Sequence, residues 1–208
     1  MSLKASDAAL VVVDVQNDFF PGGPLAIEGA DEVVPVVNRL MNAATRVAAV
    51  QDWHPKDHVS FASNHKGKKA GDTVDAGGVR QALWPDHCVQ MTRGAEFHPW
   101  LDGRRVGLVL RKGARRDLDG TSAFVENDGK TLTGLAGWLT ALGVKRVYLC
   151  GIATESAVRA SALDAAKAGF DAVVVEDACR GFDAAKAAAA VAEMKKAGVK
   201  VVRSAEVA

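Results

Sequence analysis

Asp52 and His54 carry side chains that could bind a metal ion. They lie two positions apart, so both side chains point to the same side of an extended segment. A carboxylate oxygen and an imidazole nitrogen together suit a borderline divalent ion such as zinc, iron or manganese. A third ligand could come from His58, His65 or His87, because every histidine of the chain falls in one loop-like segment. The alternative is a solvated polar pair that binds no metal.

Further charged side chains follow apolar runs of the sequence. Asp14 comes directly after the run Ala8–Val13, and Lys112 comes two residues after the run Val106–Leu110. In open parallel sheets, ligands bind beyond the carboxyl ends of the strands. We therefore expect Asp14, Lys112 and the Asp52–His54 pair to converge on one site.

The elements that must position these residues are short strands and amphipathic helices in alternation. Runs rich in valine predict strands over Ala8–Val13, Val47–Val50, Val106–Leu110, Val147–Cys150, Ala172–Val175 and Val199–Val202. Helical periodicity, followed in three cases by a glycine cap, predicts helices over Asp31–Ala44, Leu132–Leu142, Glu155–Ala168 and Asp183–Ala197. This alternation is typical of the α/β class. It predicts a three-layer α/β/α sandwich with a central parallel sheet, in a single domain over residues 1–208.

Residues 52–105 interrupt the alternation with a long stretch rich in Trp, Pro, His and Gly. Loops of this length inside a compact domain are usually functional or disordered. The stretch contains five large aromatic residues, which is unlike a linker: Trp53, Phe61, Trp84, Phe97 and Trp100. We expect it to form a cap that binds metal and substrate over the active site.

The composition excludes several classes of function. Lys and Arg total 26 against 25 Asp and Glu, so we expect no nucleic-acid partner. The longest apolar stretch is far shorter than the ~20 residues of a membrane helix, so we expect no membrane partner. Three unclustered cysteines fit reduced thiols, and these features together predict a soluble cytoplasmic protein. The oligomeric state stays open: Trp138 fits core packing by its helical spacing with Leu135 and Leu142, and a contact in a homo-oligomer is the alternative.

Four segments of the chain form a recognisable set of motifs. They read Val12-Val-Asp14-Val-Gln-Asn-Asp-Phe19, Gln51-Asp52-Trp-His54-Pro55, Trp84-Pro-Asp-His87-Cys-Val-Gln90 and Gly151-Ile-Ala-Thr-Glu155. This set resembles nicotinamidases of the pyrazinamidase type, within the isochorismatase-like (cysteine hydrolase) superfamily. The resemblance covers nearly the whole chain, and its second and third segments are similar to the metal-binding branch. It implies the isochorismatase-like fold and hydrolysis of a small amide.

The resemblance implies a catalytic role for three positions. Asp14 matches the family's general base and then acid, which takes a thiol proton and passes it to the leaving ammonia. Lys112 matches the lysine that stabilises the thiolate. Residue 157 matches the nucleophile, and the main-chain amides of Ala153 and Ala157 match the oxyanion donors beside a cis bond between Ile152 and Ala153.

The resemblance also implies a metal site and a substrate pocket. Asp52, His54 and His87 match the ligands of one divalent ion (zinc, iron or manganese), and Ser60 matches a fourth, variable ligand. The ion would hold the pyridine nitrogen of nicotinamide. The pocket would be lined by the aromatic residues Phe19 and Trp84 and by Ile152.

Residue 157 is where the chain departs from the family. The family motif reads Thr-[Asp/Glu]-x-Cys-Val, whereas this chain reads Thr154-Glu-Ser-Ala157-Val158. A methyl group cannot attack a carbonyl carbon. We reject as replacements three cysteines outside a helix start and a serine turned about 100° away along a helix: Cys88, Cys150, Cys179 and Ser156.

Two explanations account for Ala157. The chain is either an inactive cysteine-to-alanine variant or a natural pseudoenzyme that binds a ligand without turnover. The retained Asp14, Lys112 and metal motif favour the first.

The implied function is conversion of nicotinamide to nicotinate and ammonia through a cysteine thioester when residue 157 is cysteine. Thr121 stands where the family often has a tyrosine, so another small amide substrate within the superfamily is an alternative. The pseudoenzyme is the other.

Overall fold

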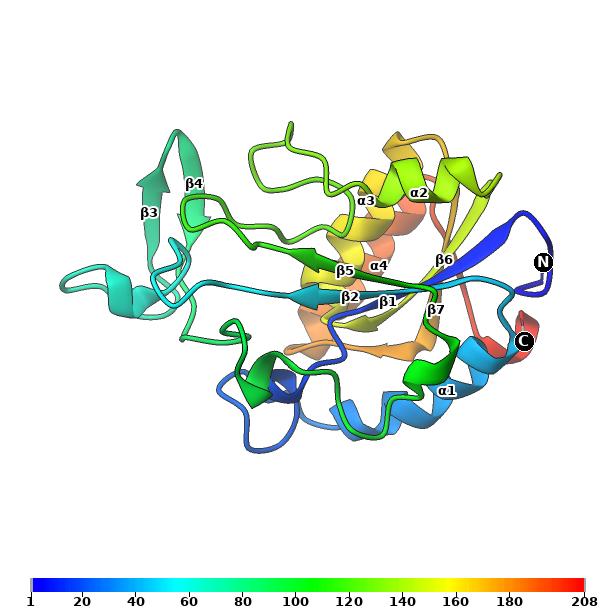
Figure 1. Ribbon diagram of the computed structural model, residues 1–208, viewed down its shortest axis with the longest axis horizontal. Helices are drawn as coiled ribbons and strands as arrows, with labels where there is room; N and C mark the ends of the chain where they lie inside the picture. Colours follow the sequence, from blue (N-terminus) through cyan, green and yellow to red (C-terminus); the bar gives the residue numbers. More distant parts are fainter. Residues whose placement is uncertain (1, 208) are drawn as a thin grey trace.

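The computed structural model describes residues 2–207 and has a six-stranded parallel sheet at its centre (Figure 1). The strands lie in the spatial order β5-β2-β1-β6-β7-β8. Their bounds are β1 Ala8–Val13, β2 Val47–Asp52, β5 Leu108–Lys112, β6 Arg146–Ile152, β7 Asp171–Arg180 and β8 Lys200–Val202. All six predicted strands are present, and all neighbours in the sheet are parallel.

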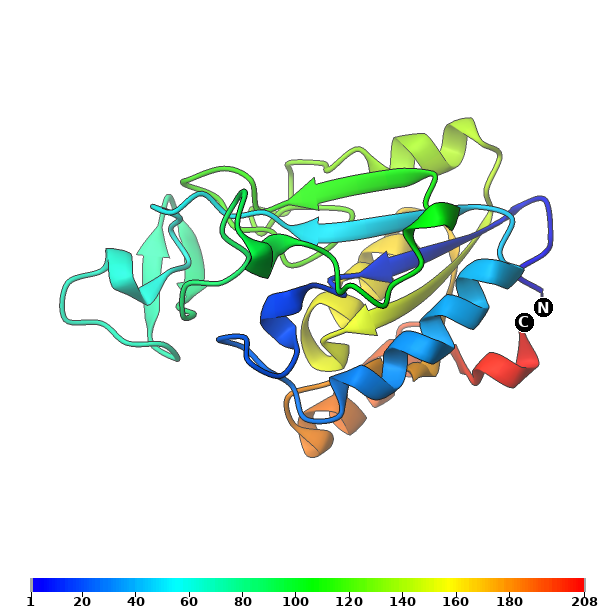
Figure 2. The same cartoon turned by 60° about the horizontal axis from the view of Figure 1, so that its bottom comes forward.

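Helices cover both faces of the sheet, as Figures 1 and 2 show. One face is covered by α1 (Val33–Ala43), and the other by α2 (Leu135–Ala141), α3 (Arg159–Lys167) and α4 (Ala184–Lys196). The central strand β1 is buried along its whole length, which explains its near-continuous valine content. The predicted three-layer α/β/α sandwich is therefore confirmed. Within the described part of the chain, every helix is too short or too polar to cross a bilayer.

Element ends differ from the predictions in a consistent way. The strand predicted over Val106–Leu110 is shifted by two residues to Leu108–Lys112, because backbone pairing with β2 continues through the polar residues Arg111 and Lys112. The helix predicted over Glu155–Ala168 begins with a π-helical turn, Thr154–Val158, before α3. A hydrophobic run therefore marks only the buried part of a strand, and main-chain hydrogen bonds extend the strand beyond that run.

Residues 52–105, the loop-like stretch that we expected to form a cap, contain a β-hairpin that the sequence analysis did not predict. Strands β3 (Thr73–Ala76) and β4 (Val79–Ala82) pair in antiparallel register. Gly77 and Gly78 connect them with φ angles of 56° and 83°. Two positive φ angles are what a type I′ hairpin turn requires, and a Gly-Gly pair supplies them without strain. The hairpin projects beyond the carboxyl ends of the large sheet (Figure 1).

The register of the sheet places the polar strand ends side by side. Asp52 at the end of β2 pairs directly with Lys112 at the end of β5. Val13, the last residue of β1, pairs with Val50 on one side and with Gly151 on the other. The predicted convergence beyond the carboxyl ends follows from this alignment.

Gly151 is the position where the sheet tolerates no side chain. Its φ is 121°, and a Cβ there would overlap the Val13 carbonyl oxygen and approach the Val13 nitrogen to 2.8 Å. We expect Gly151→Ala to lower the free energy of unfolding by about 3 kcal/mol, because backbone strain and overpacking add. The matched control is Gly137→Ala in α2, where a Cβ meets nothing within 4 Å. Urea unfolding should show the control unchanged or slightly more stable. Equal losses for the two variants would contradict this account of the β1–β6 contact.

Candidate active site

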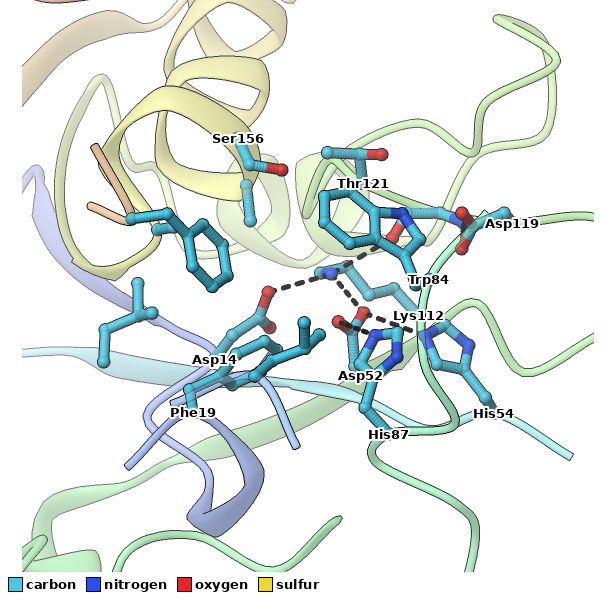
Figure 3. A pocket seen from close by; sticks show the side chains of 16 residues that line it. Asp14, Phe19, Asp52, His54, Trp84, His87, Lys112, Asp119, Thr121 and Ser156 are labelled. Carbon is cyan, nitrogen blue, oxygen red and sulfur yellow. Dashed lines mark hydrogen bonds and ion pairs between the residues drawn. The ribbon is translucent and has the colours of Figure 1, made fainter. Parts of the chain in front are cut away.

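A pocket lies beyond the carboxyl ends of β1, β2, β5 and β6 (Figure 3). The cavity is small, about 50 Å³, and it opens to solvent at its mouth. Its lining combines charged groups at strand ends with aromatic and small apolar residues. These are Asp14, Phe19, Leu25, Asp52, His54, Trp84, His87, Lys112, Asp119, Gly120, Thr121, Ile152, Ala153, Ser156, Ala157 and Phe182.

Lys112 is the centre of the charged network. Its side chain is 1% exposed, and its ammonium lies 2.9 Å from Oδ2 of Asp14. The same ammonium donates a short hydrogen bond to Oδ1 of Asp52 and another, of 3.0 Å, to the Gly120 carbonyl oxygen. Three acceptors from three segments therefore surround one buried cation, which compensates its desolvation.

The network separates the acidities of the two carboxyl groups. Burial, opposed by the charge of Lys112 and assisted by the nearby Asp52, raises the pKa of Asp14 to about 8. Burial also acts to raise the pKa of Asp52, but the charges of Lys112 and His54 outweigh it and hold that pKa well below its usual value. Burial opposes the charge of Lys112, yet Asp14 and Asp52 together raise its pKa. Asp14 is thus the carboxyl group able to exchange a proton near neutral pH.

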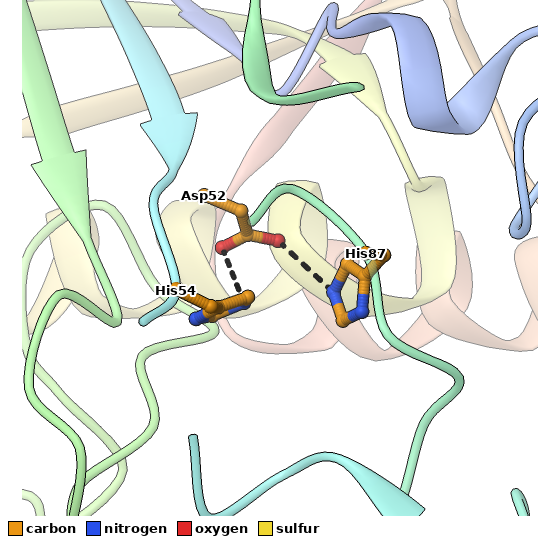
Figure 4. A group of neighbouring side chains, drawn as sticks. All are labelled: Asp52, His54 and His87. Atoms are coloured by element: carbon orange, nitrogen blue, oxygen red, sulfur yellow. Dashed lines mark ion pairs between the residues drawn. The ribbon is translucent and has the colours of Figure 1, made fainter. Parts of the chain in front are cut away.

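Nε2 of His54 and Nε2 of His87 both face the Asp52 carboxylate (Figure 4). Nδ1 of His54 lies 2.8 Å from the Gly113 carbonyl oxygen, and Nδ1 of His87 lies 2.9 Å from the Pro85 carbonyl oxygen. A carbonyl oxygen only accepts, so each Nδ1 carries a proton, and Nε2 is the ring atom that could bind a metal ion. Both Nε2 atoms lie 3.7 Å from an oxygen of Asp52.

This donor set fits a divalent metal ion. One donor atom from each of the three residues lies within 4.8 Å of the other two. Two ligands bound at ~2.1 Å to one tetrahedral ion lie about 3.4 Å apart. This is close to the 3.7 Å between each Nε2 and an oxygen of Asp52. Hydrogen bonds from the outer ring nitrogens to carbonyl oxygens orient histidine ligands in metal proteins. Asp52, His54 and His87 could therefore hold an ion with small movements.

The other polar residues considered as ligands lie elsewhere. Oγ of Ser60 is 2.7 Å from Nδ1 of His58, and Ser60 does not line the pocket. The His58 ring stacks on His54 at 4.2 Å, and His58 forms a second acid–imidazole group with His54 and Asp119. Nε2 of His65 is hydrogen bonded to the Val59 carbonyl oxygen, away from the pocket. His87 completes the group that contains Asp52 and His54, whereas His58 belongs to a second candidate group with His54 and Asp119.

The apolar residues expected at the site all line the pocket. Phe19 packs edge-on against His87 with ring centroids 5.9 Å apart. Trp84, Ile152 and the pair Ala153 and Ala157 line it as well, and the Ile152–Ala153 peptide bond is cis.

Ser156 also lines the pocket, which contradicts the expectation that it turns away. The π-helical turn over Thr154–Val158 changes the angle between successive residues there. Among the described residues, the Ser156 hydroxyl makes no hydrogen bond to Asp14 or Lys112.

None of the three cysteines is placed as a nucleophile, and all three lie in the described range. Cys88, Cys150 and Cys179 are buried and absent from the pocket lining. Burial raises the pKa of Cys88 and Cys150, and it raises the pKa of Cys179 to about 12. Thiols in such surroundings stay protonated and unreactive.

Several lining residues were missed by the sequence analysis. Asp119 is buried and accepts hydrogen bonds from the Gln81 side chain (2.8 Å) and the Gly120 main-chain amide (2.8 Å). This links hairpin strand β4 to the segment that supplies an acceptor for Lys112. Phe182 follows β7, and the strand-end rule would have found it had the strand been extended past Val175 to Arg180.

The double pairing of Lys112 predicts unequal effects of two substitutions. Lys112→Met leaves two buried carboxylates uncompensated, so we expect a loss of about 3–5 kcal/mol in the free energy of unfolding. Asp14→Asn leaves Lys112 paired with Asp52, and asparagine tolerates the positive φ of 51° at this position. The free energy of unfolding of Asp14→Asn should fall by no more than about 1.5 kcal/mol. Urea unfolding in the presence of a chelator measures both, and equal losses would show that Lys112 does not hold the two carboxylates together.

Comparison with known proteins gives a consistent family. A family model described as Isochorismatase domain matches residues 8–206. A nicotinamidase of Acinetobacter baylyi is 49% identical over 180 residues, which cover 86% of this chain and 84% of that protein.

Solved structures share the fold. A nicotinamidase and pyrazinamidase of Acinetobacter baumanii superposes with a TM-score of 0.94 at 45% identity, over 98% of this chain and 99% of that chain. A protein of L. infantum in complex with nicotinate gives 0.87 at 36% identity, over 98% and 96%. A pyrazinamidase of Pyrococcus horikoshii in complex with zinc gives 0.79 at 38% identity, over 95% and 99%. The match along nearly the whole chain shows that this protein belongs to the isochorismatase family, among relatives that are nicotinamidases.

Proposed function

We propose that the pocket hydrolyses nicotinamide to nicotinate and ammonia when residue 157 is cysteine, and that with Ala157 it binds the amide without turnover. One observation carries the proposal. The Asp14–Lys112 pair and the Asp52, His54 and His87 group line one pocket together with residue 157. Relatives named nicotinamidase at up to 49% identity support the choice of amide.

Asp14 and Lys112 would serve a thiol at position 157. Asp14 takes the S–H proton while sulfur forms a bond to the amide carbon, and the Lys112 ammonium stabilises the negative charge. The carbonyl oxygen receives hydrogen bonds from the main-chain amides of Ala153 and Ala157. Asp14 then returns the proton to nitrogen as the C–N bond breaks, which releases ammonia. Water hydrolyses the thioester to the carboxylate and restores the thiol.

Asp52, His54 and His87 would hold one divalent ion, with Ser60 as a fourth ligand only if its contact with His58 breaks. When bound, the ion supplies a coordination position for the ring nitrogen of a pyridine amide. We propose zinc among zinc, iron and manganese, because two imidazoles and a carboxylate suit it and a zinc-bound pyrazinamidase has this fold. Phe19, Trp84 and Ile152 would orient the ring.

A second candidate function rests on Ala157 itself. No thiol lines the pocket in the described chain, yet the charged network is intact, and this combination fits a ligand-binding pseudoenzyme. Hydrolysis of another small amide stays an alternative because Thr121 supplies no ring. Several expectations stay predictions: a single domain with its cap, a cytoplasmic location, the absence of a nucleic-acid partner and a homo-oligomer.

Restoring the nucleophile tests the proposed function. We expect zinc-loaded Ala157→Cys to release ammonia from nicotinamide with a rate at least a thousandfold above the chain with Ala157, because only the thiol can form the acyl intermediate. A coupled ammonia assay measures both proteins. Absence of turnover in the cysteine form with zinc, iron and manganese supplied in turn would contradict the hydrolase and favour the pseudoenzyme.

Removing single imidazoles tests the metal site. His54→Ala and His87→Ala should each weaken zinc binding at least tenfold, because each deletes one of three donors. His65→Ala is the matched control, since that ring contacts Val59 away from the pocket. Competition with a zinc-sensitive dye measures the affinity without any need for activity. Equal affinity in all three variants would place the metal elsewhere.

A further inference from the structure

Phe182 is a partly exposed aromatic residue at the pocket that the proposed chemistry does not use. It lies two residues after the end of β7, lines the pocket and keeps 41% of its surface exposed. Ligand pockets are lined largely by apolar and aromatic side chains, so a partly exposed ring in the pocket lining is available to contact the ligand.

Phe182 stacks on Trp84. Their ring centroids lie 6.3 Å apart, and the ring planes differ by 25°. Trp84 belongs to the cap segment, so the pair joins the cap to the sheet side of the pocket. Phe19 is only 6% exposed and packs beside His87, at the metal group. The difference in exposure places Phe19 at the inner end of the pocket and Phe182 at its mouth.

The position of Phe182 is fixed on both sides. The amide of Asp183 donates a 3.0 Å hydrogen bond to Oε1 of Glu155, and the Asp183 carboxylate accepts one of 2.8 Å from the amide of Lys186 at the start of α4. On the other side, a Cβ on Gly181 would overlap Oε2 of Glu155. Glu155 therefore holds the connection between β7 and α4 against the π-helical turn, which limits movement of the Phe182 backbone.

Thr121 leaves part of the pocket without an aromatic wall. Thr121 lines the same pocket as Trp84, and its short side chain offers no stacking surface. We propose that Phe182 is a specificity-determining residue, which with Trp84 forms an aromatic wall at the mouth and favours planar aromatic amides over aliphatic ones. The inference rests on the proposed function, whose substrate it narrows.

The test measures binding to the zinc-loaded chain with Ala157, which separates affinity from turnover. Loss of one aromatic contact corresponds to about a three- to tenfold weaker Kd. By calorimetry, we expect Phe182→Ala and Phe182→Leu to weaken nicotinamide binding by this factor, and Phe182→Tyr to stay within about twofold because it keeps the ring. Leu132→Ala, an exposed apolar residue outside the pocket, is the matched control and should leave Kd unchanged.

A non-aromatic amide separates stacking from pocket shape. The affinity for isobutyramide, measured by competition with nicotinamide, should change less than twofold in Phe182→Ala. Unchanged nicotinamide binding in Phe182→Ala, parent-like binding in Phe182→Leu, or a parallel loss for isobutyramide each overturns the inference and leaves the proposed function standing. Absence of nicotinamide binding by the unsubstituted zinc-loaded chain overturns the proposed function, and this inference with it.

Discussion

The burial of one ammonium group between two carboxylates is the constraint on which the site depends. Lys112 can stay charged in the interior only because Asp14 and Asp52 lie against it. Asp14 directly follows β1, Asp52 ends β2 and Lys112 ends β5, so the parallel register of three strands is a condition for the pairing. The strong burial of β1 and the exclusion of any side chain at Gly151 serve this alignment.

The same network connects the proton-transfer group to the metal group. Asp52 contacts the ammonium through Oδ1. Its two oxygens also face Nε2 of His54 and Nε2 of His87. Among residues 2–207 the Asp14 carboxylate makes its one ion pair with the ammonium, and burial raises its pKa to about 8, while the pKa of Asp52 is held low. Two carboxyl groups that contact the same cation therefore differ in pKa, and only Asp14 can exchange a proton near neutral pH. Residues 52–105 contribute His87 and Trp84, and the Gln81–Asp119 hydrogen bond joins this stretch to the segment that follows β5.

The sequence could predict the layers and the convergence of charges because both follow from local rules. Valine-rich runs mark buried parallel strands, and ligand groups follow their carboxyl ends. The sequence did not predict the hairpin over Thr73–Ala82, because its strands are short and partly exposed. Only the Gly77-Gly78 pair indicates a turn there. The choice of His87 over His58 depends on ring contacts between distant segments, which residue spacing cannot report. Phe182 escaped because β7 continues for five residues past its last valine.

Crystals of the zinc-loaded chain soaked with nicotinamide test the central claim most directly, since Ala157 leaves the amide intact. Anomalous diffraction at the zinc edge locates the ion, and the difference density locates the ring. The account predicts a zinc peak bounded by Asp52, His54 and His87, with the amide carbon facing Ala157 and the Asp14–Lys112 pair. A zinc peak outside these three residues, or a ring bound away from Ala157, would contradict it.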